Sequence, residues 1–398
     1  MSPVDADGAT RRWRGLPRAV WALGIVSLCM DLSSEMIHGL LPAFLSVELG
    51  VGAVALGLLE GGSEAIASAL KIASGAWSDR TRRRKSLAVF GYALSALSKP
   101  LFPMADSFVL IAGARAIDRV GKGIRGAPRD ALVADITAPE IRGAAYGLRQ
   151  ALDTIGAVLG PVIAVAWMLG SGDDFRAVFA IAVVPAALAV LVLVFGVREP
   201  SAPAASSGKP PMRWSDMARL PRGVWVVVGL AFAIGVARLG ETFLVLSVLD
   251  AGLAVAWSPL ALVAMNVVYA AMAYPAGRLS DRRPRPQVLL VSCVVLLVGH
   301  ATLAVASGIV AVAIGIALFG AHMALGQGLL SAWLSDRAPP EQRGTAFGAL
   351  HLANGLAAIV GGAAAGVAWS RGGMGLTYAI GVGLAAVACG LVAATMRR

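Results

Sequence analysis

Twelve apolar segments, each long enough to cross a bilayer, constrain this chain more than any other feature of its sequence. A helix needs about 20 mainly apolar residues to span the hydrocarbon core, and in that medium only helices and closed barrels satisfy their backbone groups. We therefore predict an all-α membrane protein with twelve transmembrane helices. The segments cover residues 18–45, 53–77, 86–104, 107–130, 144–170, 176–197, 222–250, 257–279, 286–305, 308–335, 344–369 and 374–396.

Composition and charge support this class and argue against nucleic-acid binding. The chain is 58% hydrophobic and only 14% charged, which differs strongly from a soluble domain. Its net charge of +11 comes from Lys and Arg in short loops beside the apolar segments. Such residues are retained on the cytoplasmic side during insertion. The pattern predicts a multi-pass protein with both termini in the cytoplasm and with no nucleic-acid partner.

The cysteine spacing argues against disulfides and thiolate metal sites, and the first residues argue against a cleaved signal peptide. Cys29, Cys293 and Cys389 lie in apolar segments without CxxC spacing, so we expect no disulfide framework, no thiolate metal site and no cofactor. The first 20 residues carry four Arg but no short apolar stretch that ends in a small-residue cleavage site. The first apolar segment is therefore predicted to be a retained membrane helix.

The sequence repeats itself once. Asp135-x-x-x-Pro139-Glu140-x-Arg142-Gly143 returns as Asp336-x-x-x-Pro340-Glu341-x-Arg343-Gly344, an offset of 201 residues. Residues between 198 and 221 are rich in Pro, Ser and Ala, which is typical of a mobile linker. We predict parallel repeats, with an N-terminal six-helix bundle over 1–197, a cytoplasmic linker over 198–221 and a C-terminal six-helix bundle over 222–398.

A basic loop occurs in both halves between the second and third apolar segments. In each copy a Gly lies four residues before an Asp-Arg pair. The pattern resembles the signature loop of the major facilitator superfamily. The resemblance implies the major facilitator fold, two pseudo-symmetric six-helix bundles, and a conformational latch in which the Asp pairs with basic groups on neighbouring helices. The latch residues would be Gly75, Asp79, Arg80, Gly277, Asp281 and Arg282.

Ionisable residues inside the apolar segments are concentrated in the N-terminal half. Asp31, Glu35 and His38 are spaced i, i+4, i+7 and share one helix face. Such groups are costly in a membrane and mark ion or substrate paths by default. Burial favours the neutral carboxylic acid, so Asp31 or Glu35 is expected to exchange protons near neutral pH. The candidate substrate-binding residues are Asp31, Glu35, His38, Glu60, Glu64, Asp118 and Asp153.

The same residues have a structural interpretation. These acids can neutralise buried bases in ion pairs that hold the bundle together. For any single residue, pairing and a transport role remain open alternatives, whereas for the whole cluster we favour transport. His38 is either a titrating group or a hydrogen-bonded packing residue. The bases concerned are Lys71, Lys99, Arg115, Arg119 and Arg149.

Two further stretches resemble motifs of the superfamily. Arg115 lies about where the family's Arg in the fourth segment assists proton transfer in antiporters, which implies a proton-coupling role. Gly156-x-x-x-Gly160-Pro161 resembles the antiporter motif of exporting members. Small residues at this spacing also allow close helix contact, and Pro kinks a helix, so plain helix packing is the alternative.

Another resemblance concerns the substrate. The stretches Met30 to His38 and Gly121 to Asp135 look like a bacterial branch of the superfamily that includes nickel and cobalt resistance permeases. Ni²⁺ and Co²⁺ accept imidazole and carboxylate ligands. The resemblance therefore implies His38 and Glu35 as metal ligands.

We predict a transporter and not an enzyme: a proton-coupled exporter of a divalent metal such as nickel or cobalt, in the bacterial inner membrane. One alternative is a proton-coupled exporter of a small organic molecule or drug. A second alternative is a non-transporting membrane sensor or scaffold. The expected partners are a small-molecule or ion substrate, protons and the lipid bilayer, and a monomer is expected.

Overall fold

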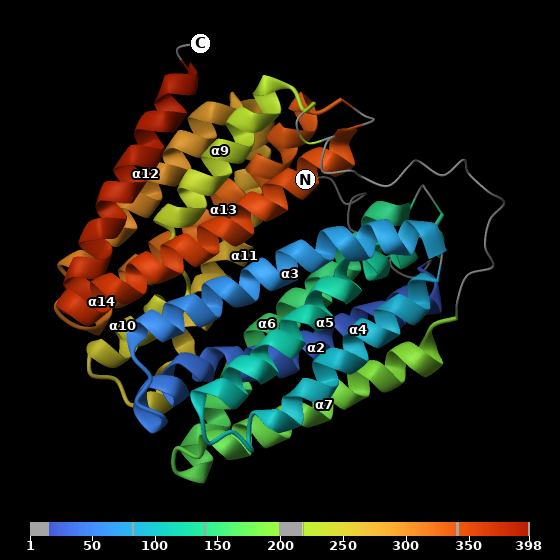
Figure 1. Cartoon of the computed structure of the whole chain (residues 1–398), viewed down its shortest axis with the longest axis horizontal. Coiled ribbons are helices and arrows are strands. Elements are labelled where there is room, and N and C mark those ends of the chain that lie inside the picture. Colours follow the sequence, from blue (N-terminus) through green and yellow to red (C-terminus); the bar gives the residue numbers. More distant parts are fainter. Residues whose placement is uncertain are drawn as a thin grey trace, which may run out of the picture.

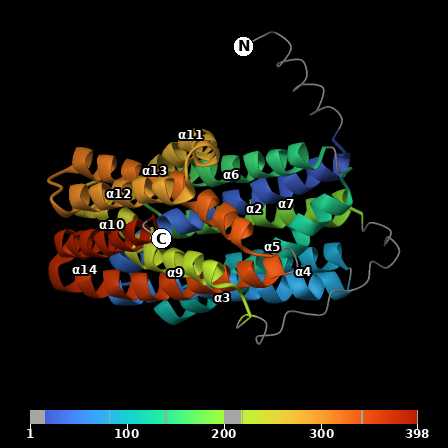
Figure 2. The same ribbon diagram turned by 90° about the horizontal axis from the view of Figure 1, so that it is seen from above.

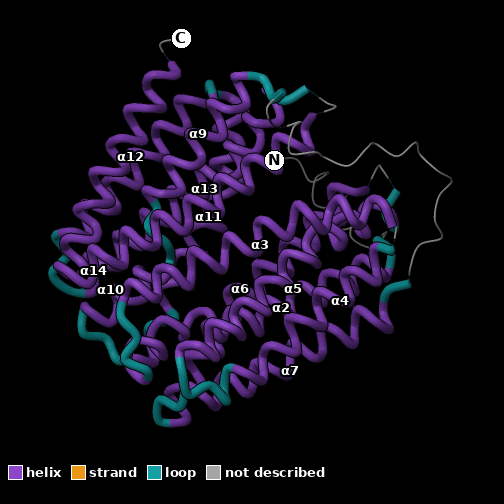
Figure 3. Tube along the Cα trace, in the orientation of Figure 1, coloured by secondary structure: helices purple, strands orange, loops and turns teal. Residues whose placement is uncertain are grey.

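The computed structural model describes residues 16–81, 83–138, 141–198, 217, 219–339 and 342–396. Within these ranges the chain is almost entirely helical, with loops at the helix ends (Figure 3). The elements are α2 (Arg18–Ala43), η1 (Phe44–Glu48), α3 (Ala53–Thr81), α4 (Arg84–Ser98), η2 (Lys99–Leu101), α5 (Phe108–Asp135), α6 (Arg142–Ser171), α7 (Phe175–Gly196), α9 (Arg222–Ala237), α10 (Thr242–Asp250), η4 (Val255–Trp257), α11 (Leu260–Arg282), α12 (Arg285–Ala304), α13 (Ile309–Arg337) and α14 (Arg343–Met396).

The number of spanning helices differs from the predicted twelve for local reasons. Among the described residues, nine helical stretches are long and apolar enough to cross a membrane. Helix α4 has only 15 residues, and α5 has a low apolar content because many charged residues lie along it. Helix α14 contains a break at Gly372 and Gly373 and so joins two of the predicted segments. The predicted linker, residues 198–221, lies mostly outside the described residues.

The helices form two groups, which we call the N-terminal half (α2 to α7) and the C-terminal half (α9 to α14) (Figure 1). In the first, α2 packs on α6 and α7, and α5 packs on α3 and α4. In the second, α12 packs on α13 and α14, while α9 packs on α14. The halves meet along two seams, α3 against α14 and α6 against α11 (Figure 2).

The two ends of the molecule differ in charge. Several helices begin with Arg at one end, which we call the basic end; the other is the far end. In Figure 1 the halves converge toward the far end and diverge toward the basic end. The helix-starting arginines are Arg18, Arg84, Arg142, Arg222, Arg285 and Arg343. The far end carries loops 49–52, 102–107, 172–174, 251–254 and 305–308.

Glycines bring α3 and α14 into close contact near the far end. A Cβ on Gly57 would overlap the backbone of Gly362, and a Cβ on Gly366 would overlap the backbone at Ala53 and Val54. Small residues at a helix interface allow backbones to approach closely in a membrane. The α3–α14 seam is therefore closed at the far end.

Substituting Gly57 tests whether this contact holds the far end shut. In Gly57→Ala the added Cβ has no space in the closed arrangement, and overpacking of this kind costs about 1–3 kcal/mol. We expect the far end to open more often. A Thr242→Cys reporter, at a position only 4% exposed between the halves, should then react faster with a membrane-impermeant maleimide.

Gly62→Ala is the matched control, because Gly62 lies on the same helix and has open space where its Cβ would be. It should leave the labelling rate unchanged. Equal labelling in the Gly57 and Gly62 variants would contradict the role of the glycine seam.

One ion pair occurs in both halves at the basic end. Arg84 Nη1 lies 2.6 Å from Asp135 Oδ2, and Arg285 Nε lies 2.6 Å from Asp336 Oδ2. The members of the two pairs are separated by the repeat offset of 201 residues. Each pair joins the start of one α-helix to the end of the α-helix that follows it in its half, α4 to α5 and α12 to α13.

A charge exchange tests the C-terminal pair. Arg285→Asp places two carboxylates together and should lower the melting temperature, while Arg285→Asp with Asp336→Arg should restore it. The effect should be small, about 0–1 kcal/mol, because both side chains are partly exposed to water. Thermal unfolding of the purified protein checks this, with Arg283→Asp, at an exposed neighbouring position, as the control. A double variant no more stable than Arg285→Asp would rule out the pairing.

Candidate functional site

A histidine held between two carboxylates lies inside the N-terminal half. His38 and Glu35 belong to α2, and Glu60 belongs to α3. His38 Nδ1 lies 3.3 Å from Glu35 Oε2, and His38 Nε2 lies 3.4 Å from Glu60 Oε1. Both ring nitrogens therefore have an acidic partner. A histidine in this position can bind and release a proton with an acceptor on either side.

The chain of charges continues from Glu60 into α5. Arg115 Nη2 lies 3.3 Å from Glu60 Oε2 and Arg115 Nη1 lies 3.9 Å from Asp118 Oδ2. Lys99 Nζ donates to Asp118 Oδ1 and to Ser34 Oγ, both at 3.1 Å. We call this set the inner ion network; its members are Ser34, Glu35, His38, Glu60, Lys99, Arg115 and Asp118.

The deepest members of the inner ion network form a structural anchor. Arg115 and Lys99 are 1% exposed and Asp118 is 2% exposed. Removing one partner of a buried ion pair leaves an uncompensated charge, which is strongly destabilising. The pairing that the sequence offered as an alternative to transport is present here, between Lys99 and Asp118 and between Arg115 and Glu60.

Asp118→Asn should therefore destabilise the protein by about 3–5 kcal/mol, because Lys99 is left buried without its carboxylate. Lys99→Met combined with Asp118→Leu removes both charges and should recover most of that loss. Thermal unfolding in detergent measures both effects. Asp106→Asn, in an exposed loop at the far end, is the control. If Asp118→Asn melts like that control, the anchor role is wrong.

The remaining predicted acids lie elsewhere. Asp31 lies beside Asp153 of α6 and not beside Glu35. Asp153 Oδ1 lies 3.6 Å from Arg149 Nη1 and 3.9 Å from Arg129 Nη1. The face that the sequence assigns to Asp31, Glu35 and His38 is thus divided between two clusters.

Glu64 and Lys71 lie near α14, along the seam between the halves. Glu64 accepts a hydrogen bond from Ser68 Oγ at 3.5 Å, and both Glu64 and Lys71 interact with His351 of α14 across the seam. The structure therefore does not bring Glu64 together with His38 and Glu60.

The glycines of the antiporter-like motif pack α6 against α2. A Cβ on Gly156 would meet the backbone at Leu28, and a Cβ on Gly160 would meet Leu32 and Glu35. Pro161 lies close to Gly39, as does Pro259 of the C-terminal half. The motif thus sets the position of the helix that carries Glu35 and His38.

The predicted latch residues lie at the basic end. Gly75 packs its α-carbon toward Ala127 of α5. Asp79 and Arg80 occupy the last turn of α3, and their side chains lie outside the described residues. In the second copy, Gly277 has open space around it, and Asp281 and Arg282 are exposed. The latch therefore stays a prediction.

The inner ion network is poorly suited to a metal ion. In the described part of the chain, no group of three His, Cys, Asp or Glu side chains could hold one. His38 and Glu35 contact each other, but the second oxygen of Glu60 is taken by Arg115. A guanidinium beside a carboxylate repels a divalent cation.

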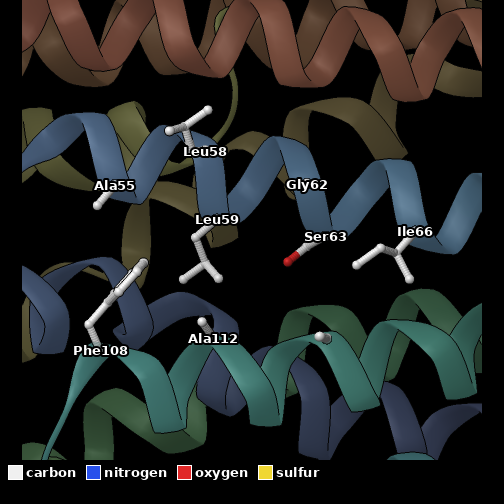
Figure 4. A pocket seen from close by; sticks show the side chains of 9 residues that line it. Ala55, Leu58, Leu59, Gly62, Ser63, Ile66, Phe108 and Ala112 are labelled. Carbon is white, nitrogen blue, oxygen red and sulfur yellow. The ribbon is translucent and has the colours of Figure 1, made fainter.

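Two hollows flank this site. A small one, of ≈ 10 Å³, is lined by His38 and Glu60 from the N-terminal half and by Thr242 from the C-terminal half. A larger groove, of ≈ 330 Å³, lies between α3 and α5, and Figure 4 shows Leu59 and Ser63 pointing into it. Leu59 lines both hollows. The sequence signals neither of them, because both depend on how separate helices pack.

Comparisons with known proteins agree with this architecture. A model of the Major Facilitator Superfamily matches residues 23–362 and 230–398. A protein of Methanocaldococcus jannaschii described as an uncharacterized MFS-type transporter is 30% identical over 363 residues, which cover 89% of this chain and 89% of that protein. Multidrug resistance protein MdtH of Yersinia enterocolitica is 35% identical over 122 residues, covering 31% of this chain and 30% of that protein.

Solved structures of transporters have the same fold. A variant of the nucleoside transporter NupG has a TM-score of 0.79 at 15% identity, over 94% of this chain and 99% of that chain. A variant of the peptide transporter POT has a TM-score of 0.79 at 15% identity, over 96% of this chain and 95% of that chain.

Proposed function

The chain belongs to the Major Facilitator Superfamily and is a transporter, not an enzyme; on that premise we propose that it exports a small organic molecule in exchange for protons. The proposal depends on one observation. His38 lies between Glu35 and Glu60, on two helices of the N-terminal half, where an ionisable group is retained only at a cost.

Proton exchange would explain why these ionisable groups are retained despite their energetic cost in the membrane. Glu35 and His38 would bind a proton while the site faces one side and release it on the other, and Arg115 would tune this step through its contact with Glu60. Asp31 is a second proposed proton carrier, beside Asp153. The packing of Gly156 and Gly160 against α2 supports the antiporter interpretation, since it places α6 directly behind Glu35.

An organic cargo is favoured by the partial similarity to a multidrug resistance protein. Export of nickel or cobalt, the expectation from the sequence, has the His38–Glu35 contact in its favour. The relatives reported above do not support a nickel or cobalt function, however, and Arg115 occupies the carboxylate that a third ligand would supply. We therefore rank metal export second.

The proposal includes a topology. The basic residues at helix starts support a cytoplasmic location for the basic end. In this topology α4, α5 and both parts of α14 would cross the bacterial inner membrane, which makes twelve spans in two bundles, 1–197 and 222–398. The far-end contact of α3 with α14 then corresponds to an inward-facing monomer. The basic loops at Gly75 and Gly277 would latch the opposite arrangement.

Inside-out vesicles with an imposed acid interior test the function. Ethidium and other organic cations, then Ni²⁺, Co²⁺ and Zn²⁺, are added while a dye reports the internal pH. We expect an organic cation to release protons, and Glu35→Gln or His38→Gln to slow this release by about tenfold or more, equivalent to roughly 1.4 kcal/mol in the barrier.

Glu48→Gln is the matched acid-to-amide control, because Glu48 is exposed at the end of the same helical stretch. A response to metals alone would move the protein to the metal-export class. A response that survives both Glu35→Gln and His38→Gln would remove the inner ion network from coupling, and silence with every cation would favour a sensor or scaffold.

A further inference from the structure

The seventh apolar segment, expected to be one helix, is broken in the middle. Helix α9 ends at Ala237 and α10 begins at Thr242. Between them, Leu239 has φ 62° and Gly240 has φ 92°. A left-handed backbone is unfavourable for a residue other than glycine, because its Cβ crowds the following carbonyl oxygen. Strain of this kind persists only where surrounding structure enforces it, and it is concentrated at functional sites.

Two charged residues, Arg238 and Glu241, lie at the break, on the side that faces the N-terminal half. Arg238 Nη2 lies 3.5 Å from Glu241 Oε1, across the break. The Arg238 guanidinium lies 5.7 Å from the centre of the Phe319 ring. The pair is therefore held on its own half while α10 contacts α2 and α3.

Thr242, which follows Glu241, shows that the break lies close to the inner ion network. Its side chain is 4% exposed and lines the small hollow that His38 and Glu60 line from the opposite half. Glu241 immediately precedes it. The bend thus brings the Glu241 carboxylate of the C-terminal half within electrostatic range of His38, Glu60 and Glu35 of the N-terminal half.

The charges around Glu241 come from several helices. Arg238 is on its own segment, and α2 and α3 contribute groups from across the seam. Arg115 and Arg119 of α5 lie behind Glu60, and His322 of α13 faces Arg238. The groups that face this point are Glu35, His38, Glu60, Arg115, Arg119, Arg238 and His322.

We propose that Glu241 is the coupling carboxylate of the C-terminal half, which holds the far end closed while His38 is charged and favours its opening once His38 is neutral. This inference rests on the proposed proton exchange, because it names the group that links the proton to closure. When His38 carries a proton, a cation lies among three carboxylates and attracts Glu241 across the seam. When that proton leaves to water at the basic end, Glu241 faces Glu35 and Glu60 with one fewer cation, and repulsion opposes closure.

The effect can be measured without any cargo. Spin labels at Met104→Cys and Val305→Cys, which are 69% and 82% exposed in far-end loops of the two halves, report whether that end is open. The background replaces Cys29, Cys293 and Cys389 by Ser. Purified protein in lipid nanodiscs is examined by double electron–electron resonance from about pH 5 to about pH 9, the range around histidine titration.

We expect the long-distance population to grow as the pH rises in the unsubstituted protein. In Glu241→Gln the ratio of open to closed molecules at the alkaline end should fall by about 5-fold or more, the lower limit for coupled sites. Asp250→Asn, at the exposed end of the same short helix, is the matched control and should behave like the unsubstituted protein.

A second pair of variants tests the proposal even if Glu241→Gln lowers the stability of the protein. His38→Gln removes the cation permanently and should open the far end even at acid pH, while adding Glu241→Gln should close it again. The proposal is overturned if Glu241→Gln keeps the full pH response, if the unsubstituted protein has none, or if the double variant opens like His38→Gln. Because no cargo is present, these outcomes are separate from success or failure of the vesicle transport screen.

Discussion

A charged side chain inside a membrane needs a partner, and the N-terminal half is arranged around that requirement. Lys99, Arg115 and Asp118 are all but inaccessible to solvent, and each has an opposite charge within reach. A lone charge at this depth costs several kcal/mol. The pairs therefore fix how α2, α3 and α5 are rotated against one another, and only after that can His38 lie between Glu35 and Glu60.

The two halves share a backbone plan but differ in chemistry. The repeat offset of 201 residues relates Lys99 to His300 and Asp118 to Phe319, so a buried ion pair in one half corresponds to a fully buried histidine and an aromatic ring in the other. The basic-end pairs, Arg84–Asp135 and Arg285–Asp336, are instead present in both halves. The repeat has kept its basic-end ion pairs, while the proposed proton exchange lies mainly in the N-terminal half.

The two seams between the halves also differ in the residues that form them. Gly57 and Gly362 bring α3 and α14 into backbone contact, whereas in the other seam Pro161 and Pro259 lie close to Gly39. A glycine contact allows close approach without interlocking side chains. A closed end held by such contacts, with one carboxylate from the broken seventh segment in electrostatic range of His38, is suited to separate when a single charge changes.

The sequence by itself determined the membrane class and the internal repeat, because these depend on composition and spacing along the chain, and its basic loop motif indicated the superfamily by resemblance. It also gave the direction of Asp31, Glu35 and His38 around one helix axis. The tertiary structure decided which neighbour each one meets: Asp31 lies about 6 Å along the helix from Glu35 and reaches Asp153 of α6, while His38 reaches Glu60 of α3. Periodicity gives a side chain's direction but not the helix opposite it, and it does not reveal the left-handed backbone at Leu239 that interrupts the seventh apolar segment.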